Sequence, residues 1–570
     1  MKMSLIVEQL PEPLRAEIIL NEPISTLLKQ DIPFSQIMLS EETFRALFQA
    51  MKPWEKQTLR LIVSKFASLA FNLISLQAVA NIAEISGAEL TAGLVGLRRK
   101  GVIYAIRKHW GENIFCLPAD LLSIWQELIM EPSFKWQEIR ECDVLSILDE
   151  PKTVLNNLFC FLNYLEHQPV ILTKKSEIPK RHIPKIIQKL QWKANTSITW
   201  NIKHEYVDLY TFPLALTLDI AERLQLIHWN ATCLSLCRTE LNKWLYLSQA
   251  EMSQQLFLLL RDDFMPSSAA NEHFLTKISS FPSQKWYLLE DFTSWMREYD
   301  IIIMFTDWLD VCEAFGWIEQ GLDHQSRAIF RFSIKQESSI EWVIPTGKFY
   351  VQPDYEILVP PHVSFSVRWE LTYLSDHIHT EQVGIYRLTE QSLLRALRSG
   401  RTLIYCLDFL AEHSFYGVPE FMVHVFKQWE RAEIASSILP QKIDLVEDEG
   451  LDFTTTEKYN LNDCYDFATG IPSRDEVYPS WQTVPPLWWR ECRIYHTSTR
   501  KEIVQLAIKW KAILKLNYMN KDWKLIPKQI QDHATGWNLL GWVESDLISY
   551  SQDQWQAMQL ILPGFEDLIN

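Results

Sequence analysis

The amino-acid sequence predicts a multidomain α+β protein, and three observations lead to this expectation. The chain is 570 residues long, which exceeds what one hydrophobic core usually organises. Its 47% apolar and 22% charged residues have the balance of an ordinary globular protein, so extensive disorder is not expected. Segments with helical periodicity alternate with short strand-like runs, without an internal repeat of fixed period. We therefore expect several small modules that differ in helix and strand content.

The composition and motifs of the sequence disfavour a nucleotide-hydrolysing enzyme. The chain has only 16 Gly, and a P-loop needs a Gly-rich turn whose backbone N–H groups surround phosphates. Thr346-Gly347-Lys348 contains Gly-Lys, but no Gly lies five residues before Gly347, and Phe349 follows the Lys. The sequence also has no GxGxxG, GxSxG or HExxH motif. We therefore predict a non-enzymatic protein that requires neither a cofactor nor a metal ion.

The N-terminus and the apolar segments favour a cytoplasmic location. The first 17 residues have no long apolar core and no cleavage site, so they do not resemble a signal peptide. No stretch approaches the roughly 20 apolar residues that span a bilayer. The nine Cys are scattered and have no CxxC spacing, which is typical of reduced thiols in a reducing compartment.

The N-terminal quarter of the chain has the element order of a winged helix. Prolines divide residues 1–50 into short helices. A first helix then carries the apolar residues of 59–66, Ser75 is the expected N-cap of a second helix, and a third helix spans 88–100. Strand-like runs at 102–106 and 114–117 flank a polar tip. Three helices followed by a β-hairpin predict a winged helix over 51–130.

Basic residues of this module are candidate nucleic-acid contacts. The segment 54–110 has eight basic against three acidic residues, whereas the whole chain has a net charge of −16. In DNA-binding winged helices the third helix enters the major groove and a basic wing meets the backbone. The candidates at the third helix and wing are Arg98, Arg99, Lys100, Arg107 and Lys108. Residues 89–92, which would face the bases, are acidic and apolar, so mostly phosphate contacts are expected. These basic residues have two alternative explanations without nucleic acid. Winged helices also bind proteins, and helix C-termini favour cations.

The middle of the chain, 131–280, is predicted to be mainly helical, and no function is assigned to it. Residues 174–193 are basic and turn-like, and 214–260 has helical periodicity. Cys233 and Cys237 have the i,i+4 spacing of one helix face rather than that of a metal site.

A second winged-helix-like unit is expected over 281–340. A helix ends on Gly316, a strand begins at 317–319, and 328–332 is the expected return strand.

Residues 341–432 carry a family resemblance. The segment 351–361, VQPDYEILVPP, is similar to the strand pair of the N-terminal, non-motor domain of XPB-type DNA helicases. YRLT at 386–389, SLLRAL at 392–397 and the run from 407 to Pro419 follow in that family's order. The resemblance covers about 90 residues and implies an α/β domain that handles DNA. Its candidate phosphate contacts are Arg387, Arg395 and Arg398, which could instead pair with Glu370 and Glu390.

The C-terminal part begins with an acidic stretch and ends in a small β domain. Between 444 and 476 there are ten acidic against two basic residues, which indicates an exposed linker over 433–498. A helix is expected at 503–514, followed by strands at 516–519, 523–526 and 537–543. Residues 516–518 and 536–542 resemble the WYL module, although Trp537-Asn538-Leu539 stands where that module has Trp-Tyr-Leu.

The whole chain resembles bacterial helicase-associated proteins that lack the helicase motor. That resemblance implies a non-catalytic DNA-associated accessory protein that cooperates with a separate XPB-like helicase in DNA repair or processing. The alternatives are a WYL-type winged-helix transcription regulator and a protein-interaction scaffold without DNA binding. The expected partners are DNA, mostly through phosphates, and an XPB-like helicase, without a membrane. The expected units in the first half are an N-terminal helical segment (1–50), a winged helix (51–130) and a helical region (131–280). They are followed by a second winged-helix-like unit (281–340), an XPB N-terminal-like domain (341–432), an acidic linker (433–498) and a WYL-like β domain (499–570).

Overall fold

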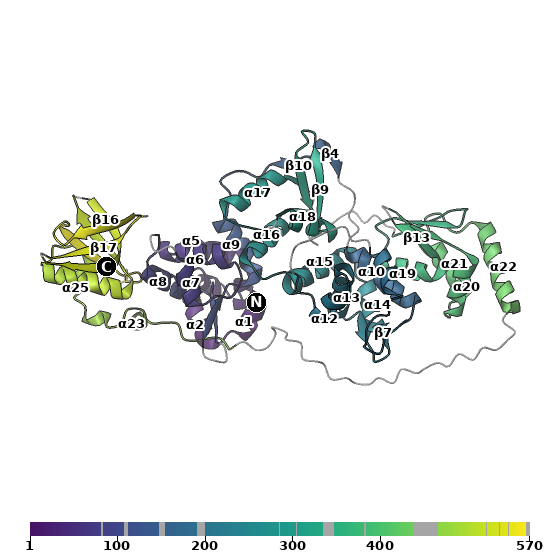
Figure 1. The fold of residues 1–570 in the computed structure, drawn as a ribbon, viewed down its shortest axis with the longest axis horizontal. Helices are drawn as coiled ribbons and strands as arrows, with labels where there is room; N and C mark the ends of the chain where they lie inside the picture. Colours follow the sequence, from purple (N-terminus) through teal and green to yellow (C-terminus); the bar gives the residue numbers. More distant parts are fainter. Residues whose placement is uncertain are drawn as a thin grey trace.

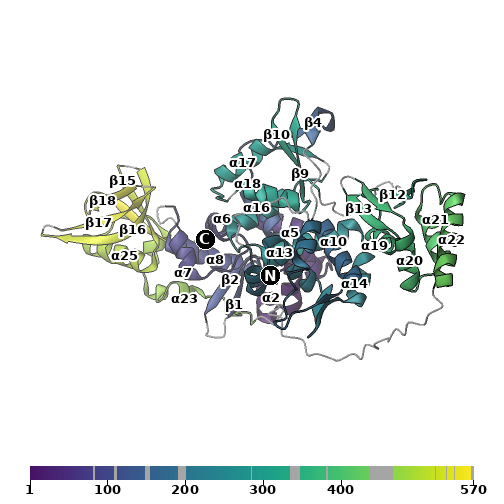
Figure 2. The same cartoon turned by 45° about the vertical axis from the view of Figure 1, so that its right-hand side comes forward.

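The computed structural model has a mixed α+β multidomain architecture with five separate sheets among its described residues. Figures 1 and 2 show the C-terminal β domain and the unit that contains α19–α22 at opposite ends of the molecule, with helical regions between them. The structure describes residues 1–80, 84–107, 112–147, 154–190, 200–283, 285–303, 305–333, 347–380, 383–436, 466–519, 521–534, 536–544 and 546–565.

The N-terminal region follows the predicted order of elements. Five short helices precede the three-helix and hairpin unit, and Pro11, Pro23 and Pro33 stand at the N-termini of three of them. The predicted cap of the second helix in the unit is wrong. Asn72 caps it by accepting the Ser75 N–H at 2.8 Å, so Ser75 lies one turn inside. The elements are α1 (Met3–Gln9), α2 (Glu12–Ile19), α3 (Ile24–Lys29), α4 (Phe34–Leu39), α5 (Glu41–Ala50), α6 (Pro53–Phe66), α7 (Leu73–Val79), α8 (Gly87–Arg99), β1 (Tyr104–Arg107) and β2 (Asn113–Cys116).

The middle region is mainly helical, as predicted, but it also contains a small sheet with the strand order β5-β7-β6. The helical spacing expected for Cys233 and Cys237 is wrong, because Cys233 opens β7 and Cys237 precedes α14. Gln225 has a φ of 59°, which ends α13 and lets the chain turn into β6. The elements are α9 (Leu122–Ile129), α10 (Val154–His167), β5 (Val170–Ile171), α11 (Ile183–Lys189), α12 (His204–Leu209), α13 (Phe212–Arg223), β6 (Ile227–Trp229), β7 (Cys233–Leu236), α14 (Arg238–Leu245) and α15 (Gln249–Leu259).

A five-stranded sheet with the order β3-β8-β10-β9-β4 projects from this region (Figure 2). The predicted turn at Gly316 and the hairpin that follows it are confirmed, and Gly316 has a φ of 72°. The sequence did not indicate the outer strands, which come from 138–147 and pair with β8 and β9 far along the chain. The elements are β3 (Glu138–Ile139), β4 (Val144–Ile147), α16 (Ala269–Ser279), β8 (Trp286–Leu288), α17 (Leu289–Glu298), α18 (Phe305–Ala314), β9 (Ile318–Asp323) and β10 (Ala328–Phe332).

Residues 347–436 form an α/β unit around a four-stranded antiparallel sheet with the order β11-β12-β14-β13. The predicted strand pair is present as β11 and β12, whereas β13 and β14 were not predicted. Phe365 and Trp369 of α19 pack against Phe159 of α10, with ring centroids 5.0 and 5.9 Å apart, so this unit rests on the helical middle. The elements are β11 (Tyr350–Val351), β12 (Glu356–Val359), α19 (Phe365–Leu374), β13 (Asp376–Thr380), β14 (Gly384–Arg387), α20 (Glu390–Arg398), α21 (Leu403–His413) and α22 (Glu420–Ser436).

The C-terminal unit packs one helix against a five-stranded antiparallel sheet with the order β18-β17-β16-β15-β19. The helix begins earlier than predicted and ends at Trp510, because Lys511 has a φ of 53°. The three predicted strands are present, and β18 and β19 complete the sheet around the buried Trp555 and Met558. The elements are α25 (Thr497–Trp510), β15 (Ile513–Tyr518), β16 (Lys521–His533), β17 (Gly536–Val543), β18 (Asp546–Ser551) and β19 (Ala557–Ile561).

The described part of the predicted acidic linker differs from an exposed linker. Residues 437–465 lie outside the described residues, but 466–478 returns to the N-terminal hairpin, and we call this segment the strap. Phe467 and Ala468 are buried in the N-terminal core, and Tyr478 is buried in the C-terminal core. Apolar side chains thus fix both ends of the strap. The short helix α23 (Arg474–Val477) lies within the strap, and α24 (Leu487–Arg490) follows before the C-terminal unit.

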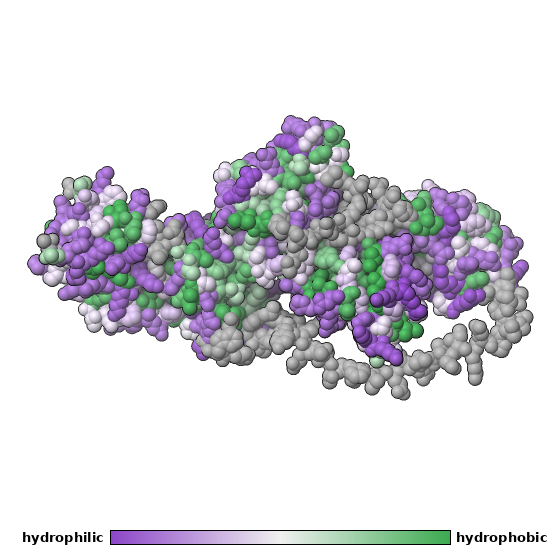
Figure 3. Space-filling model, viewed as in Figure 1, coloured by the Kyte–Doolittle hydropathy of each residue, from purple (hydrophilic) through white to green (hydrophobic). Residues whose placement is uncertain are grey.

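The visible surface is mostly hydrophilic, with hydrophobic residues in separate areas (Figure 3). Among the described residues, no helix combines the length and the apolar character needed to cross a bilayer.

Candidate nucleic-acid interface

The first predicted contact, Arg98, is buried rather than presented to solvent. Only 6% of the residue is exposed, and its Nη2 donates to the Ala468 carbonyl oxygen at 2.8 Å. The guanidinium also lies over the Phe115 ring, and burial lowers its pKa below the ordinary value. In this structure Arg98 therefore holds the strap against the hairpin, away from any ligand outside the protein.

Arg99 and Lys100, which follow it, also face protein groups. Lys100 Nζ lies 2.5 Å from Glu55 Oε1, and the two side chains are 15% and 4% exposed. Arg99 Nη2 donates to the Pro472 carbonyl oxygen at 3.4 Å, and its Nε lies 3.9 Å from Glu17. The end of α8 is thus directed at α6 and the strap.

The N-terminal end of α8 is covered by the C-terminal unit. The Ala88 N–H donates to the Lys511 carbonyl oxygen at 3.1 Å. A Cβ on Gly87 would lie 2.6 Å from the Lys511 Cδ, which shows how closely the two segments approach. The part of the third helix that enters the major groove in DNA-binding winged helices is therefore occupied by another part of this chain.

At the predicted wing, Arg107 is exposed, and Lys108 lies outside the described residues. The Arg107 N–H donates to the Asp466 carbonyl oxygen at 2.8 Å, and the Ala468 N–H donates to the Ala105 carbonyl oxygen at 2.9 Å. The strap thereby pairs with the edge of β1. Of the five predicted cations in this unit, the structure presents Arg107 outward.

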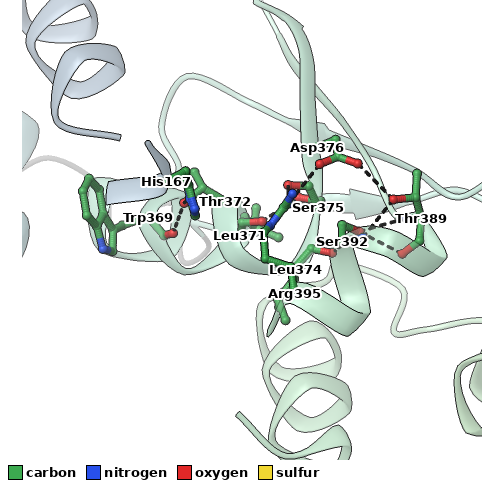
Figure 4. A network of polar contacts seen from close by, with 10 residues as sticks. All are labelled: His167, Trp369, Leu371, Thr372, Leu374, Ser375, Asp376, Thr389, Ser392 and Arg395. Carbon is green, nitrogen blue, oxygen red and sulfur yellow. Dashed lines mark hydrogen bonds and ion pairs between the residues drawn. The ribbon is translucent and has the colours of Figure 1, made fainter. Parts of the chain in front are cut away.

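The predicted arginines of 347–436 differ in their surroundings. Arg387 Nη2 lies 2.5 Å from Glu356 across neighbouring strands. Figure 4 shows Arg395 reaching from α20 to Asp376, 2.9 Å away, within a network that includes Thr389 and Ser392. Arg398 is exposed one turn further along α20. The anticipated pairing with Glu370 is made instead by Arg401, through its Nε and Nη2.

A stronger exposed basic surface lies on the helical middle, in the segment that sequence reasoning described only as basic. We call it the α11 surface. Six basic side chains between 174 and 189 are all exposed, against the single acidic residue Glu177. None of the six forms an ion pair with another described residue within 4.0 Å. They are Lys174, Lys175, Lys180, Arg181, Lys185 and Lys189.

Two histidines respond to this concentration of positive charge. His182, whose Nδ1 lies 2.7 Å from the Tyr164 hydroxyl, has a pKa lowered by burial and then by Arg181 and Lys185. Burial and then Arg395 also lower the pKa of His167, Glu166 raises it, and Arg401 and Lys189 lower it by smaller amounts. Lys189 of the α11 surface and Arg395 of α20 therefore act on one imidazole. Since His167 Nε2 lies 3.1 Å from Thr372 Oγ1, the basic region reaches the junction with 347–436 (Figure 4).

The sequence contained a signal for this surface. Six cations and one acid within 16 residues stand out in a chain with a net charge of −16. This segment predicts no particular function, because it matches no motif and because a sequence does not show which cations find acidic partners in the fold. Among the described residues, no group of three or more His, Cys, Asp or Glu side chains is placed to hold a metal ion.

Comparison with known proteins places one helicase-related domain in the chain. Residues 349–432 match the family described as helicase conserved C-terminal domain. The match coincides with the α/β unit built around β11–β14 and α19–α22 and lies within the predicted boundaries of 341–432. A search of curated proteins found no match to the chain. The shown relationship to helicases therefore rests on this domain.

Proposed function

We propose that the chain is a non-catalytic DNA-associated accessory protein that cooperates with a separate XPB-like helicase in DNA repair or processing. The observation that carries the proposal is that the helicase-related domain packs on α10, the helix that also contacts the start of α11 with its exposed cations. Phe365 and Trp369 of that domain pack on Phe159 of α10, and the Tyr164 hydroxyl of the same helix lies 2.7 Å from His182 Nδ1 at the start of α11. A helicase-related unit and a phosphate-binding surface would thus act on one stretch of nucleic acid.

The α11 surface suits phosphate contacts without sequence readout. Its six cations lie on α11 and the turn before it, and long exposed Lys and Arg side chains can follow a backbone without a fixed register. The net charge of −16 disfavours general binding of polyanions elsewhere on the molecule, so binding should be confined to this surface.

The test is the salt dependence of DNA binding by the full chain. We compare the wild type with a variant in which Lys180, Arg181, Lys185 and Lys189 are all replaced by Gln. The slope of log K against log[salt] should fall by about 3–4, since each lost phosphate contact removes about 0.9. A matched control replaces the same number of exposed cations on other elements, Lys29, Arg60, Lys135 and Arg297, and should keep the wild-type slope. Equal slopes for the two variants would remove the α11 surface from the proposal.

Partnership with a helicase needs its own experiment. The full chain, tagged and expressed at its native level, should co-purify with an XPB-like motor after nuclease treatment. Recovery that disappears with nuclease would mean that both proteins simply bind the same DNA. No motor in the eluate, together with intact DNA binding, would contradict the cooperation and leave the DNA-associated role.

A winged-helix transcription regulator of the WYL type is the second candidate, and an observation on the C-terminal unit favours it. The 13-residue strand β16 exposes Lys521, Lys524 and Lys528. A regulator would prefer one operator over random DNA by the roughly 10³–10⁷-fold typical of specific binders, and replacing these lysines by Gln would weaken that binding. The absence of any DNA binding at low salt would instead indicate a protein-interaction scaffold.

A further inference from the structure

Two exposed aromatic side chains lie in the turn between α21 and α22 of the helicase-related domain, at the end of the molecule opposite the C-terminal β domain (Figures 1 and 2). They are Phe415 and Tyr416, which are 50% and 82% exposed, and their ring centroids are 4.9 Å apart. The ring of Tyr350 on β11 lies 5.4 Å from Phe415 and 6.0 Å from Tyr416. Three rings thus form one largely exposed surface, which we call the aromatic platform.

The backbone fixes the platform to the edge of the sheet. The Phe415 N–H donates to the Phe349 carbonyl oxygen at 2.9 Å, and the Phe349 N–H donates to the His413 carbonyl oxygen at 2.9 Å. The Ser414 hydroxyl donates to the Gly417 carbonyl oxygen at 3.0 Å, and Gly417 has a φ of 80°, which closes the turn. Because the rings are held in advance, a partner that binds them pays little for ordering the turn.

The core of the domain does not use these rings. Phe349 and Val351, on either side of Tyr350, belong to that core, so Tyr350 points to the opposite face of the sheet. Phe415 and Tyr416 also lie outside the core. Aromatic side chains are enriched at protein interfaces, and exposed clusters of them mark binding surfaces. The platform is therefore a candidate binding surface.

The charge around the platform is negative. The segment 403–420 has three acidic residues and no Lys or Arg, and Lys348 stands two residues before Tyr350, so three acids face one base. The acids are exposed, and none forms an ion pair with another described residue. They are Asp408, Glu412 and Glu420. Asp408 and Glu412 stand one turn apart on α21, where like charges destabilise a helix. This charge attracts a cationic ligand and repels phosphate groups.

The same domain shows how an aromatic ring and a carboxylate together hold a guanidinium. Arg401 lies over the Tyr373 ring, 3.5 Å from its centroid, and donates from Nε and Nη2 to Glu370. A guanidinium stacks on aromatic faces and matches a carboxylate in a two-point contact, and a Lys ammonium lacks this planar geometry. The platform offers both kinds of group, and no described Lys or Arg lies over its three rings.

We propose that the aromatic platform and its three neighbouring acids bind an arginine-containing segment of a partner protein. A guanidinium of the partner stacks on Tyr416 or Phe415, the more exposed rings, and the carboxylates balance its charge. Single-stranded nucleic acid also stacks on aromatic side chains, but such sites combine the rings with cations, and here acids prevail. The inference goes beyond the proposed function, since it requires neither DNA nor a helicase.

The experiment measures binding of a fluorescein-labelled peptide, four repeats of Arg-Gly-Leu, to the full chain by fluorescence anisotropy. Physiological salt screens charges more than about 8 Å away. Tyr416→Ser should weaken binding about 2- to 30-fold, as expected for the loss of one cation–π contact. Tyr246→Ser is the matched control, because Tyr246 is 83% exposed after α14, and it should bind like the wild type. The peptide with Lys in place of Arg should bind more weakly.

A pair of triple variants separates the site from general attraction to an acidic protein. The first carries Asp408→Asn, Glu412→Gln and Glu420→Gln. The control carries Glu42→Gln, Asp208→Asn and Glu502→Gln, which are exposed acids of α5, α12 and α25. The first should weaken binding about 3- to 150-fold, since each exposed ion pair contributes modestly, and the control should bind like the wild type.

Equal affinities of the two triple variants, or of Tyr416→Ser and Tyr246→Ser, overturn the proposal. A single-stranded oligonucleotide whose binding falls in Tyr416→Ser also overturns it, because the platform would then serve nucleic acid. The fourfold Gln variant of the α11 surface should bind the peptide like the wild type, and Tyr416→Ser should keep the wild-type salt slope for DNA. The two proposals can therefore fail separately.

Discussion

Replacing Arg98 by Ala should release the strap from the N-terminal hairpin. The Nη2 of Arg98 donates to the Ala468 carbonyl oxygen at 2.8 Å in a buried setting, and the guanidinium lies over Phe115. A hydrogen bond from a charged donor contributes about 1.5–3 kcal/mol. The backbone bonds between the strap and β1 remain, so the loss should appear as local opening rather than global unfolding. Dividing by about 1.4 kcal/mol per factor of ten gives a roughly ten- to hundredfold increase in the opening equilibrium.

Hydrogen exchange followed by mass spectrometry measures this opening directly. Peptides that contain the N–H groups of Arg107 and Ala468 should exchange about ten- to hundredfold faster in the variant, while peptides from the C-terminal sheet keep their rates. Arg107→Ala is the control, because this exposed side chain belongs to the same hairpin but does not reach the Ala468 carbonyl oxygen. Unchanged exchange at Ala468 in Arg98→Ala would refute the role assigned to the buried guanidinium.

Two further predictions concern stability. His273 accepts a hydrogen bond from the Gln126 amide at Nδ1 and donates from Nε2 to the Val63 carbonyl oxygen, and burial lowers its pKa to about 4. Between about pH 6.5 and 4, the unfolded chain therefore binds a proton at this imidazole that the folded chain does not. The free energy of unfolding should fall by about 3 kcal/mol as the pH is lowered through this range. Urea unfolding over that range should show a shallower pH dependence in His273→Gln, and equal slopes would contradict the assignment. Gly541→Ala should destabilise the C-terminal unit by about 1–3 kcal/mol, because the new Cβ would lie 2.6 Å from the Leu525 Cδ2 and 2.7 Å from the Ile526 carbonyl oxygen. Thermal unfolding checks this, with an unchanged midpoint as the opposing result.

Local patterns in the sequence were sufficient to predict most helices and hairpins. The end of the third helix at residue 100 and the turn at Gly316 were predicted because a Gly follows a run of helical periodicity at each place, and both Gly101 and Gly316 have positive φ in the structure. The strands β3 and β4 were missed because their partners β8 and β9 lie more than 140 residues further along the chain, and two to four residues carry too little periodicity. Cys233 was placed on a helix because the hairpin around it is short and its apolar residues also fit a helical pattern.

The candidate site was harder to predict because charge in a sequence says nothing about partners in space. Arg98 ends a helix, where an exposed cation is ordinary, yet its acceptor lies 370 residues away at Ala468. Arg387 and Arg395 likewise find acids on neighbouring strands. The α11 cations look the same in the sequence, but no described acid comes within 4.0 Å of them. Only the fold separates these two groups.

The return of the strap to β1 has a consequence for the newly made chain. Arg98, just before the N-terminal hairpin, is synthesised 370 residues before Ala468, and at about 5–20 residues per second roughly 20–70 s pass before the edge of β1 can be covered. During that time β1 presents unpaired backbone groups, and Arg98 lacks its carbonyl acceptor. An open strand edge invites pairing with other chains. A translation product that stops before the strap should therefore aggregate through its first, otherwise complete, module, because residues 466–468 are needed to cover the edge of β1.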